Sequence, residues 1–149
     1  MSYADLRKGR FSEANRAYFV TTVVADRRPL FADFPTARLL VAEARRLHDA
    51  GKLQSLAWVV MPDHFHWLFQ LAEGGDLGKV IGALKGGSSR RINRHLALHG
   101  SLWQPAFFDH AVRADEDIMH IARYIVANPL RVGIVKTLGE YPHWDAEWL

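Results

Sequence analysis

Two histidines and one tyrosine have side chains and spacing that could act together in one reaction. His64 and His66 are two residues apart inside an apolar run from Trp58 to Leu71. Because a β-strand turns successive side chains to opposite faces, both imidazoles would point the same way and could bind one metal ion. The His-x-His motif alone is weak evidence for a metal site, because two partly exposed histidines on an amphipathic strand are the more common interpretation.

Tyr124 lies in a segment with helical periodicity, from about residue 115 to 128, that Pro129 would end. Its apolar residues form one stripe: Ile118, Ile121, Ala122, Ile125 and Val126. Tyr124 lies about 130° from the middle of that stripe, so it is not an obvious core residue. Polar residues share its side: Asp117, His120 and Asn128. An ordinary helix-flank tyrosine with its hydroxyl in water is the alternative.

A phenol near a metal held by His64 and His66 could attack a phosphodiester while the cation neutralises charge on the phosphate oxygens. Asn128 is four residues after Tyr124 and therefore its neighbour on the helix surface, where it could add an oxygen ligand. Two imidazoles with an amide oxygen favour Mn²⁺ by ligand type, with Mg²⁺ as the second candidate.

The elements that must position these residues follow a β-α-β-β-α-β order with an appended helix. Strands are predicted at 18–25, 52–61, 64–71 and 102–113, and helices at 35–50, 77–96 and 115–128, the second helix interrupted at 86–89. Pro62-Asp63 is the predicted hairpin turn before His64. The order predicts an α+β, ferredoxin-like antiparallel sheet whose appended C-terminal helix carries the tyrosine. Aromatic and aliphatic residues alternate with the histidines and would pack under helices: Phe65, Trp67, Phe69 and Leu71.

Length and composition limit the classes of protein to which this chain can belong. The length of 149 residues is enough for a core, so residues 1–149 are predicted to form a single domain. The absence of cysteine excludes a disulfide framework, a thiolate nucleophile and a cysteine-based zinc site. Without a long apolar run or a signal-peptide pattern, we expect a cytoplasmic protein with no membrane partner.

The positive charge is unevenly distributed, although the net charge is only +3. No acidic residue occurs from Leu77 to Phe108, a stretch that contains Lys79, Lys85, Arg90, Arg91 and Arg94. A second basic cluster near the start consists of Arg7, Lys8, Arg10 and Arg16. Such clusters favour phosphate-rich partners through counterion release, but they are also typical of solvated helix faces. Charge alone leaves both interpretations open.

Taken together, the residues resemble the single-tyrosine HUH transposases, in particular the REP-associated tyrosine transposase branch. The resemblance covers nearly the whole chain. Its motifs are Arg7-Lys8-Gly9-Arg10-Phe11-Ser12, Val60-Met61-Pro62-Asp63-His64-Phe65-His66, Arg90-Arg91-Ile92-Asn93-Arg94, Leu102-Trp103-Gln104 with Phe108-Asp109-His110, and Tyr124-Ile125-Val126-Ala127-Asn128-Pro129-Leu130-Arg131-Val132-Gly133.

The resemblance implies a metal-dependent endonuclease and strand transferase that acts on single-stranded DNA. His64 and His66 would bind Mn²⁺ or Mg²⁺, with Asn128 as a further ligand, and Tyr124 would form a 5′-phosphotyrosyl link and release a 3′-hydroxyl. The substrates would be hairpins of REP-like palindromic repeats. Residues expected to contact DNA are Arg7, Lys8, Arg10, Lys85, Arg90, Arg91, Arg94 and Arg131, and residues that could orient the site are Asp109, His110 and His120.

Several points stay open at this stage. The protein could be a catalytically silent nucleic-acid-binding module, or a phosphoesterase in which water is the nucleophile. It could be a monomer or a homodimer. Trp103 is expected to pack rather than to stack on a base. Gly86-Gly87 departs from the family pattern, because it is looser than a rigid DNA-facing helix should be.

Overall fold

A computed structural model describes residues 16–113, 118–128 and 144–146. The strands are β1 (Ala17–Val23), β2 (Leu53–Met61), β3 (His64–Leu71), β4 (Phe108–Ala111) and β5 (Trp144–Ala146), and the helices are α2 (Phe34–Asp49), α3 (Leu77–Leu96) and α4 (Ile118–Val126). Two short 3-10 turns, Ala25–Arg27 and Leu30–Ala32, connect β1 to α2. No helix in the described ranges has the length and apolarity needed to cross a membrane.

The strands form one antiparallel sheet in the order β4-β1-β3-β2-β5. The first four strands have the order that a β-α-β-β-α-β chain adopts in the ferredoxin-like fold, which confirms the predicted fold class. The fifth strand extends the sheet beside β2 and was not predicted. Its three residues are too short for alternation to reveal a strand.

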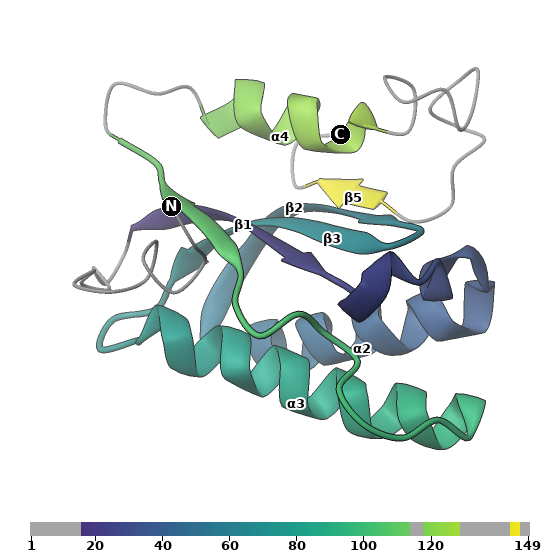
Figure 1. Cartoon of the computed structure of the whole chain (residues 1–149). Coiled ribbons are helices and arrows are strands. Elements are labelled where there is room, and N and C mark those ends of the chain that lie inside the picture. The colour runs from purple at the N-terminus through teal and green to yellow at the C-terminus, as the bar shows by residue number, and fades with distance from the viewer. Residues whose placement is uncertain (1–15, 114–117, 129–143, 147–149) are drawn as a thin grey trace.

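One face of the sheet packs against α2 and α3, and the opposite face packs against α4 (Figure 1). Phe65, Trp67 and Phe69 of β3 are fully buried in the core on the α2–α3 side. Trp67 and Phe69 have ring centroids 4.7 Å apart, which continues the packed row along the strand. The predicted aromatic row under the helices is therefore confirmed.

The histidine-bearing face is the one that α4 covers. Leu68, two residues after His66, belongs to a second apolar cluster with Ala122, Ile125 and Val126 of α4. Because residues two apart on a strand share a face, His64, His66 and Leu68 all point to this side. The predicted apolar stripe of the last helix is confirmed, and it brings that helix to the face that carries the histidines.

The hairpin and the first helix agree closely with the sequence. The β2–β3 turn is formed by Pro62-Asp63, and β3 begins at His64 as predicted. Helix α2 begins after Asp33, whose side chain accepts a hydrogen bond from the backbone N–H of Thr36, and it ends near Gly51, which has φ +73°. Both ends follow from the preference of aspartate for N-caps and of glycine for the left-handed region.

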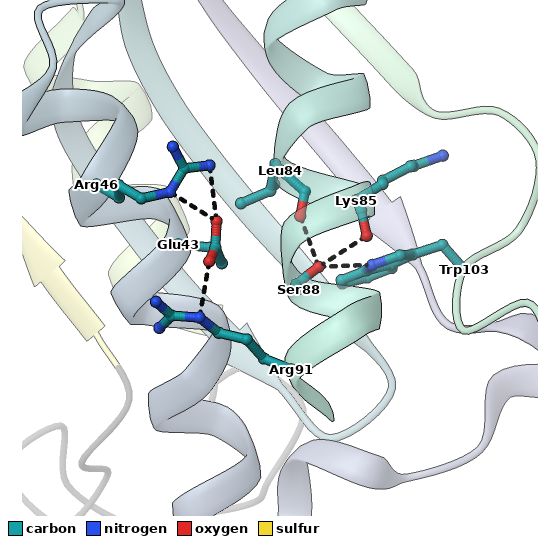
Figure 2. A network of polar contacts seen from close by, with 7 residues as sticks. All are labelled: Glu43, Arg46, Leu84, Lys85, Ser88, Arg91 and Trp103. Atoms are coloured by element: carbon teal, nitrogen blue, oxygen red, sulfur yellow. Dashed lines mark hydrogen bonds and ion pairs between the residues drawn. The ribbon is translucent and has the colours of Figure 1, made fainter. Parts of the chain in front are cut away.

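Helix α3 is continuous over all 20 residues, so the predicted interruption at residues 86–89 is wrong. Gly87 is buried against α2, and a Cβ atom there would lie 2.7 Å from Cδ of Glu43. The glycine therefore lets the two helices pack closely instead of loosening α3. Figure 2 shows the Glu43 carboxylate between Arg46 of α2 and Arg91 of α3.

The predicted strand at 102–113 is also too long, because only Phe108–Ala111 pairs with β1. Trp103 instead makes one isolated bridge with Val24, and its indole N–H donates to Oγ of Ser88 at 3.0 Å. Its ring packs against Phe31 with centroids 5.6 Å apart. Pro105 has no N–H for a strand ladder, so this segment runs as an irregular connection over the core.

Candidate metal and nucleophile site

His64 and His66 direct one ring nitrogen each toward a common point. Their Nε2 atoms are 3.1 Å apart, and the rings meet edge to face with centroids 4.6 Å apart. Both side chains are partly buried, and that of His64 is 20% exposed. The predicted shared face of the two histidines is confirmed, and the geometry makes them a converging pair.

The other ring nitrogen of each histidine is held by a side chain of the protein. Nδ1 of His64 lies 2.7 Å from Oδ1 of Asp63, and Nδ1 of His66 lies 2.8 Å from Oγ1 of Thr21. A carboxylate can only accept hydrogen bonds, so His64 donates from Nδ1 and keeps a lone pair on Nε2. Phe19 meets the His66 ring edge to face at 5.6 Å, which further fixes that ring.

Asp63 connects the site to the end of β1. Its Oδ2 accepts a hydrogen bond from Nη1 of Arg27 at 3.1 Å. Burial raises the pKa of Asp63, but the hydrogen bond from His64 and the hydrogen bond and charge of Arg27 outweigh it, so the pKa lies below its ordinary value. Arg27 and its neighbour Asp26 both have left-handed backbone, with φ of 51° and 59°. This costs roughly 1–2 kcal/mol per residue and holds Arg27 beside the hairpin turn.

Thr21 and Asp63 are site residues that sequence reasoning missed. Asp63 was predicted as a turn residue and stands in the motif that ends at His66, but it was given no role in the site, although its position directly before the first histidine was a usable signal. Thr21 had no such signal, since it is 45 residues from His66 and reaches it through the β1–β3 register.

The histidine pair fits a divalent cation. In an octahedral site with bonds of about 2.1 Å, two adjacent ligands are roughly 3 Å apart, close to the observed nitrogen separation of 3.1 Å. Within residues 16–113, 118–128 and 144–146, no group of three or more His, Cys, Asp or Glu side chains is placed to hold a metal. Among the described residues, further ligands would be oxygens of another kind, such as the amide of Asn128, while phosphate and water could supply others.

Tyr124 and Asn128 come from α4 and the residues just after it, on the histidine side of the sheet. Tyr124 is 44% exposed and lies off the buried stripe, as predicted. Asn128 is 7% exposed, so its amide belongs to the interior. His120 is exposed, and Asp117 lies outside the described residues. The predicted roles of Tyr124, Asn128 and His120 stay predictions.

The β1–β4 register separates the two residues of β4 that were expected to orient the site. His110 is paired with Phe19, and Asp109 with Val20. Paired residues share a face, so His110 lies on the face of Phe19 and His66, whereas Asp109 lies on the opposite face. Their proposed roles as orienting groups remain predictions, with only His110 on the histidine face.

The basic residues of α3 lie on the other side of the sheet from the histidines. Arg90 and Arg94 are exposed. Arg91 is half exposed and donates from Nε to the buried carboxylate of Glu43 at 3.0 Å (Figure 2). Their predicted DNA contacts stay predictions, and so do those of Arg7, Lys8, Arg10 and Arg131, which lie outside the described residues.

Lys85, a further predicted DNA contact, has a structural role. Its Nζ donates to the backbone carbonyls of Gln104 and Ala106, at 2.9 and 2.8 Å, and lies 5.7 Å from the ring centre of Phe107. Trp103 is 5% exposed, which confirms the expectation that it packs.

Comparison with known proteins identifies relatives of the chain. The family model described as "Transposase IS200 like" matches residues 13–128. The REP-associated tyrosine transposase of Escherichia coli (strain K12) is 34% identical over 86 residues, which are 58% of this chain and 50% of that protein. A relative from Haemophilus influenzae (strain ATCC 51907 / DSM 11121 / KW20 / Rd), provisionally given the same name, is 28% identical over 143 residues, or 85% of this chain and 77% of that protein. The match thus spans half the length of the Escherichia coli relative.

Two solved structures share the fold. A REP-associated tyrosine transposase bound to a REP hairpin superposes with a TM-score of 0.79 at 26% identity, covering 97% of this chain and 82% of that chain. A provisionally assigned transposase from Deinococcus radiodurans R1 gives a TM-score of 0.58 at 25% identity, covering 80% of this chain and 95% of that chain. With a family match that spans most of its length and includes both histidines and the tyrosine, the chain belongs to the IS200-like transposase family.

Proposed function

We propose that the protein is a metal-dependent endonuclease and strand transferase that cleaves single-stranded DNA at hairpin-forming repeats. The observation that carries the proposal is the convergence of the His64 and His66 Nε2 atoms, 3.1 Å apart, on the sheet face that the tyrosine helix covers. Family membership supports the reaction class. The relative with a bound REP hairpin supports a substrate of that kind.

Tyr124 is the proposed nucleophile. Its hydroxyl gives up its proton as the oxygen attacks the phosphorus of a phosphodiester. The bond to the 3′-oxygen breaks, and that oxygen takes up one proton and leaves as a 3′-hydroxyl. The 5′-phosphate stays joined to the tyrosine until a 3′-hydroxyl of another strand reverses the step. The 44% exposure of Tyr124 leaves its ring accessible to a DNA backbone.

His64 and His66 would hold Mn²⁺ or Mg²⁺, and Asn128 is the proposed third protein ligand. A bound divalent ion would supply positive charge beside the phosphate oxygens that gain negative charge during attack. Asp63 and Thr21 keep the two imidazoles in place from their Nδ1 sides. Ligating histidines are commonly fixed by such partners.

DNA binding is assigned to the basic residues that the sequence singled out, among which Arg90 and Arg94 are exposed on α3. Such side chains contact phosphates without reading sequence. Because α3 and the histidines lie on opposite faces of the sheet, a hairpin that contacts α3 must pass an edge of the sheet before its strand reaches Tyr124. The chain would act as a monomer or a homodimer.

The test is incubation of the protein with labelled hairpins from the host's own repeats and Mn²⁺ or Mg²⁺, followed by a denaturing gel. We expect a metal-dependent covalent adduct that Tyr124→Phe abolishes while hairpin binding persists. Tyr18→Phe is the matched control, because Tyr18 is buried in the core on the opposite face, and this variant should still form the adduct.

The other outcomes identify the alternatives. Adduct formation by Tyr124→Phe would refute the assigned nucleophile. Cleavage without an adduct that survives this substitution would indicate a phosphoesterase with water as nucleophile. Binding without cleavage across a broad set of hairpins would indicate a catalytically silent nucleic-acid-binding module.

A further inference from the structure

Four side chains form a continuous row of hydrogen bonds across the histidine site. Asp63 contacts Nδ1 of His64 at 2.7 Å, the two histidines share an Nε2–Nε2 contact of 3.1 Å, and Nδ1 of His66 contacts the hydroxyl of Thr21 at 2.8 Å. Each contact needs one donor and one acceptor, so the direction of one bond determines the direction of the next.

The carboxylate of Asp63 sets this direction, because it can only accept. His64 therefore donates from Nδ1, and with a neutral ring its Nε2 is an acceptor. The contact between the rings then requires a proton on Nε2 of His66, which leaves a lone pair on Nδ1. The hydroxyl of Thr21 completes the row as the donor to that lone pair.

A cation can bind this pair only if both Nε2 atoms offer lone pairs. His64 already does so, but His66 must change its tautomer: the proton leaves Nε2, and a proton is taken up at Nδ1. The number of protons on the pair is unchanged. In the metal-bound state Nδ1–H of His66 needs an acceptor beside it. In the metal-free state Nδ1 of the same ring needs a donor at that position.

We infer that Thr21 is a positioning residue that allows His66 to change tautomer when a cation binds. A hydroxyl can do this because rotation about its C–O bond turns it from donor to acceptor at the same position. A carboxylate such as that of Asp63 could only accept from His66, and a valine at position 21 could neither donate nor accept a hydrogen bond. The inference rests on the proposed metal site of the nuclease and adds a residue that the family comparison does not assign.

Thr22 provides a matched control for Thr21. It is the next residue on β1 and points to the opposite face, where it is paired with Phe65. It is 1% exposed, and its Oγ1 is buried without a hydrogen-bond partner among the described residues. The same Thr→Val change can therefore be made at two adjacent positions, one that contacts His66 and one that does not.

The first experiment is a calorimetric titration of the full chain with Mn²⁺ in the absence of DNA. We expect Thr21→Val to raise the Kd about 10- to 100-fold, as loss of a partner behind a metal-bound histidine usually does. Thr21→Ser keeps a hydroxyl and should restore the affinity of the native chain. Thr22→Val should bind Mn²⁺ like the native chain. An unchanged Kd for Thr21→Val would overturn the inference.

The second experiment reads the tautomer directly by ¹⁵N NMR of the histidine rings, and it needs no variant to fold. The metal-free native chain should carry the His66 proton on Nε2, and the chain titrated with diamagnetic Zn²⁺ should carry it on Nδ1. A proton on Nδ1 of His66 before metal is added would overturn the inference. If the native chain bound neither ion, both the inference and the proposed metal site would fail. If the native chain binds Mn²⁺ and Thr21→Val binds it with the same Kd, the inference about Thr21 fails while the proposed metal site stands.

Discussion

Substitution of Gly87 by alanine should destabilise the protein, although alanine is the better helix former. The new methyl group would lie 2.7 Å from Cδ of Glu43, well inside the roughly 3.5–4.0 Å at which carbon atoms make favourable contact. The carboxylate must therefore move. Its side chain is only 4% exposed and is held by Arg46 at 3.0 Å and by Arg91 at 3.0 Å (Figure 2).

The magnitude follows from three opposing contributions. Overpacking a close helix contact costs about 1–3 kcal/mol. Loss of one charge-assisted hydrogen bond to the displaced carboxylate costs about 1.5–3 kcal/mol. Replacing glycine by alanine inside a helix returns about 1 kcal/mol. We therefore expect Gly87→Ala to lower the free energy of unfolding by about 1.5–5 kcal/mol.

Chemical denaturation with urea measures this change, and Gly82→Ala is the matched control. Gly82 is on the same helix and exposed, and a Cβ atom there would meet nothing within 4 Å. That variant should gain about 1 kcal/mol from helix propensity alone. The two alanine variants should thus change stability in opposite directions.

A double-mutant cycle with Glu43→Ala tests the assigned cause. Without the Glu43 side chain the methyl group at position 87 has room, and Arg46 and Arg91, each about half exposed, can return to water. In that background Gly87→Ala should be neutral or stabilising, so the coupling energy should equal or exceed the cost in the native background, that is, about 1.5 kcal/mol or more. The reasoning is refuted if Gly87→Ala is as stable as Gly82→Ala, or if its cost persists in the Glu43→Ala background.

Three further substitutions test the hydrogen bonds that stabilise α2 and α3. Lys85→Met should cost about 1–3 kcal/mol in urea denaturation, because two backbone carbonyls lose a charged donor, whereas Lys79→Met at an exposed position should change stability by less than about 0.5 kcal/mol. Asp76→Ala removes the N-cap of α3 and should cost about 1 kcal/mol, and an unchanged urea midpoint would contradict that role. Hydrogen bonding by Thr36 keeps the pKa of Asp33 below 3.8. The ionised Asp33 therefore stabilises the folded protein above that pH, and this contribution is lost as the pH falls through the lowered pKa. The melting temperatures of Asp33→Ala and the native chain should therefore differ at neutral pH and converge well below pH 3.8; a constant difference would count against this.

Local patterns in the sequence were sufficient for the strand that carries the histidines and for the helix that carries the tyrosine. Alternation along residues 64–71 depends only on the pleat of a single strand, so the common face of His64 and His66 could be predicted without knowing any partner. The stripe of α4 likewise depends only on the helical period, and it correctly left Tyr124 outside the core.

Predictions failed where a residue's environment comes from another element. Gly87 looked like a break because glycine weakens an isolated helix, but Glu43 of α2 makes it a close contact. Lys85 was predicted to contact DNA, which stays a prediction, but no pattern indicated that its ammonium group donates to two carbonyls of the segment before β4. Neither partner is near in sequence, so no local pattern announces it.

The sequence by itself determined the reactive residue types, the shared face of the histidines and the family to which the chain belongs. The tertiary structure alone decided what holds the histidines, because Thr21 reaches His66 through the β1–β3 register and Arg27 reaches Asp63 through a left-handed turn. It also decided that the α3 arginines and the histidines lie on opposite faces. Periodicity gives the face of a residue relative to its own element, whereas partners across a sheet depend on how distant elements pack together.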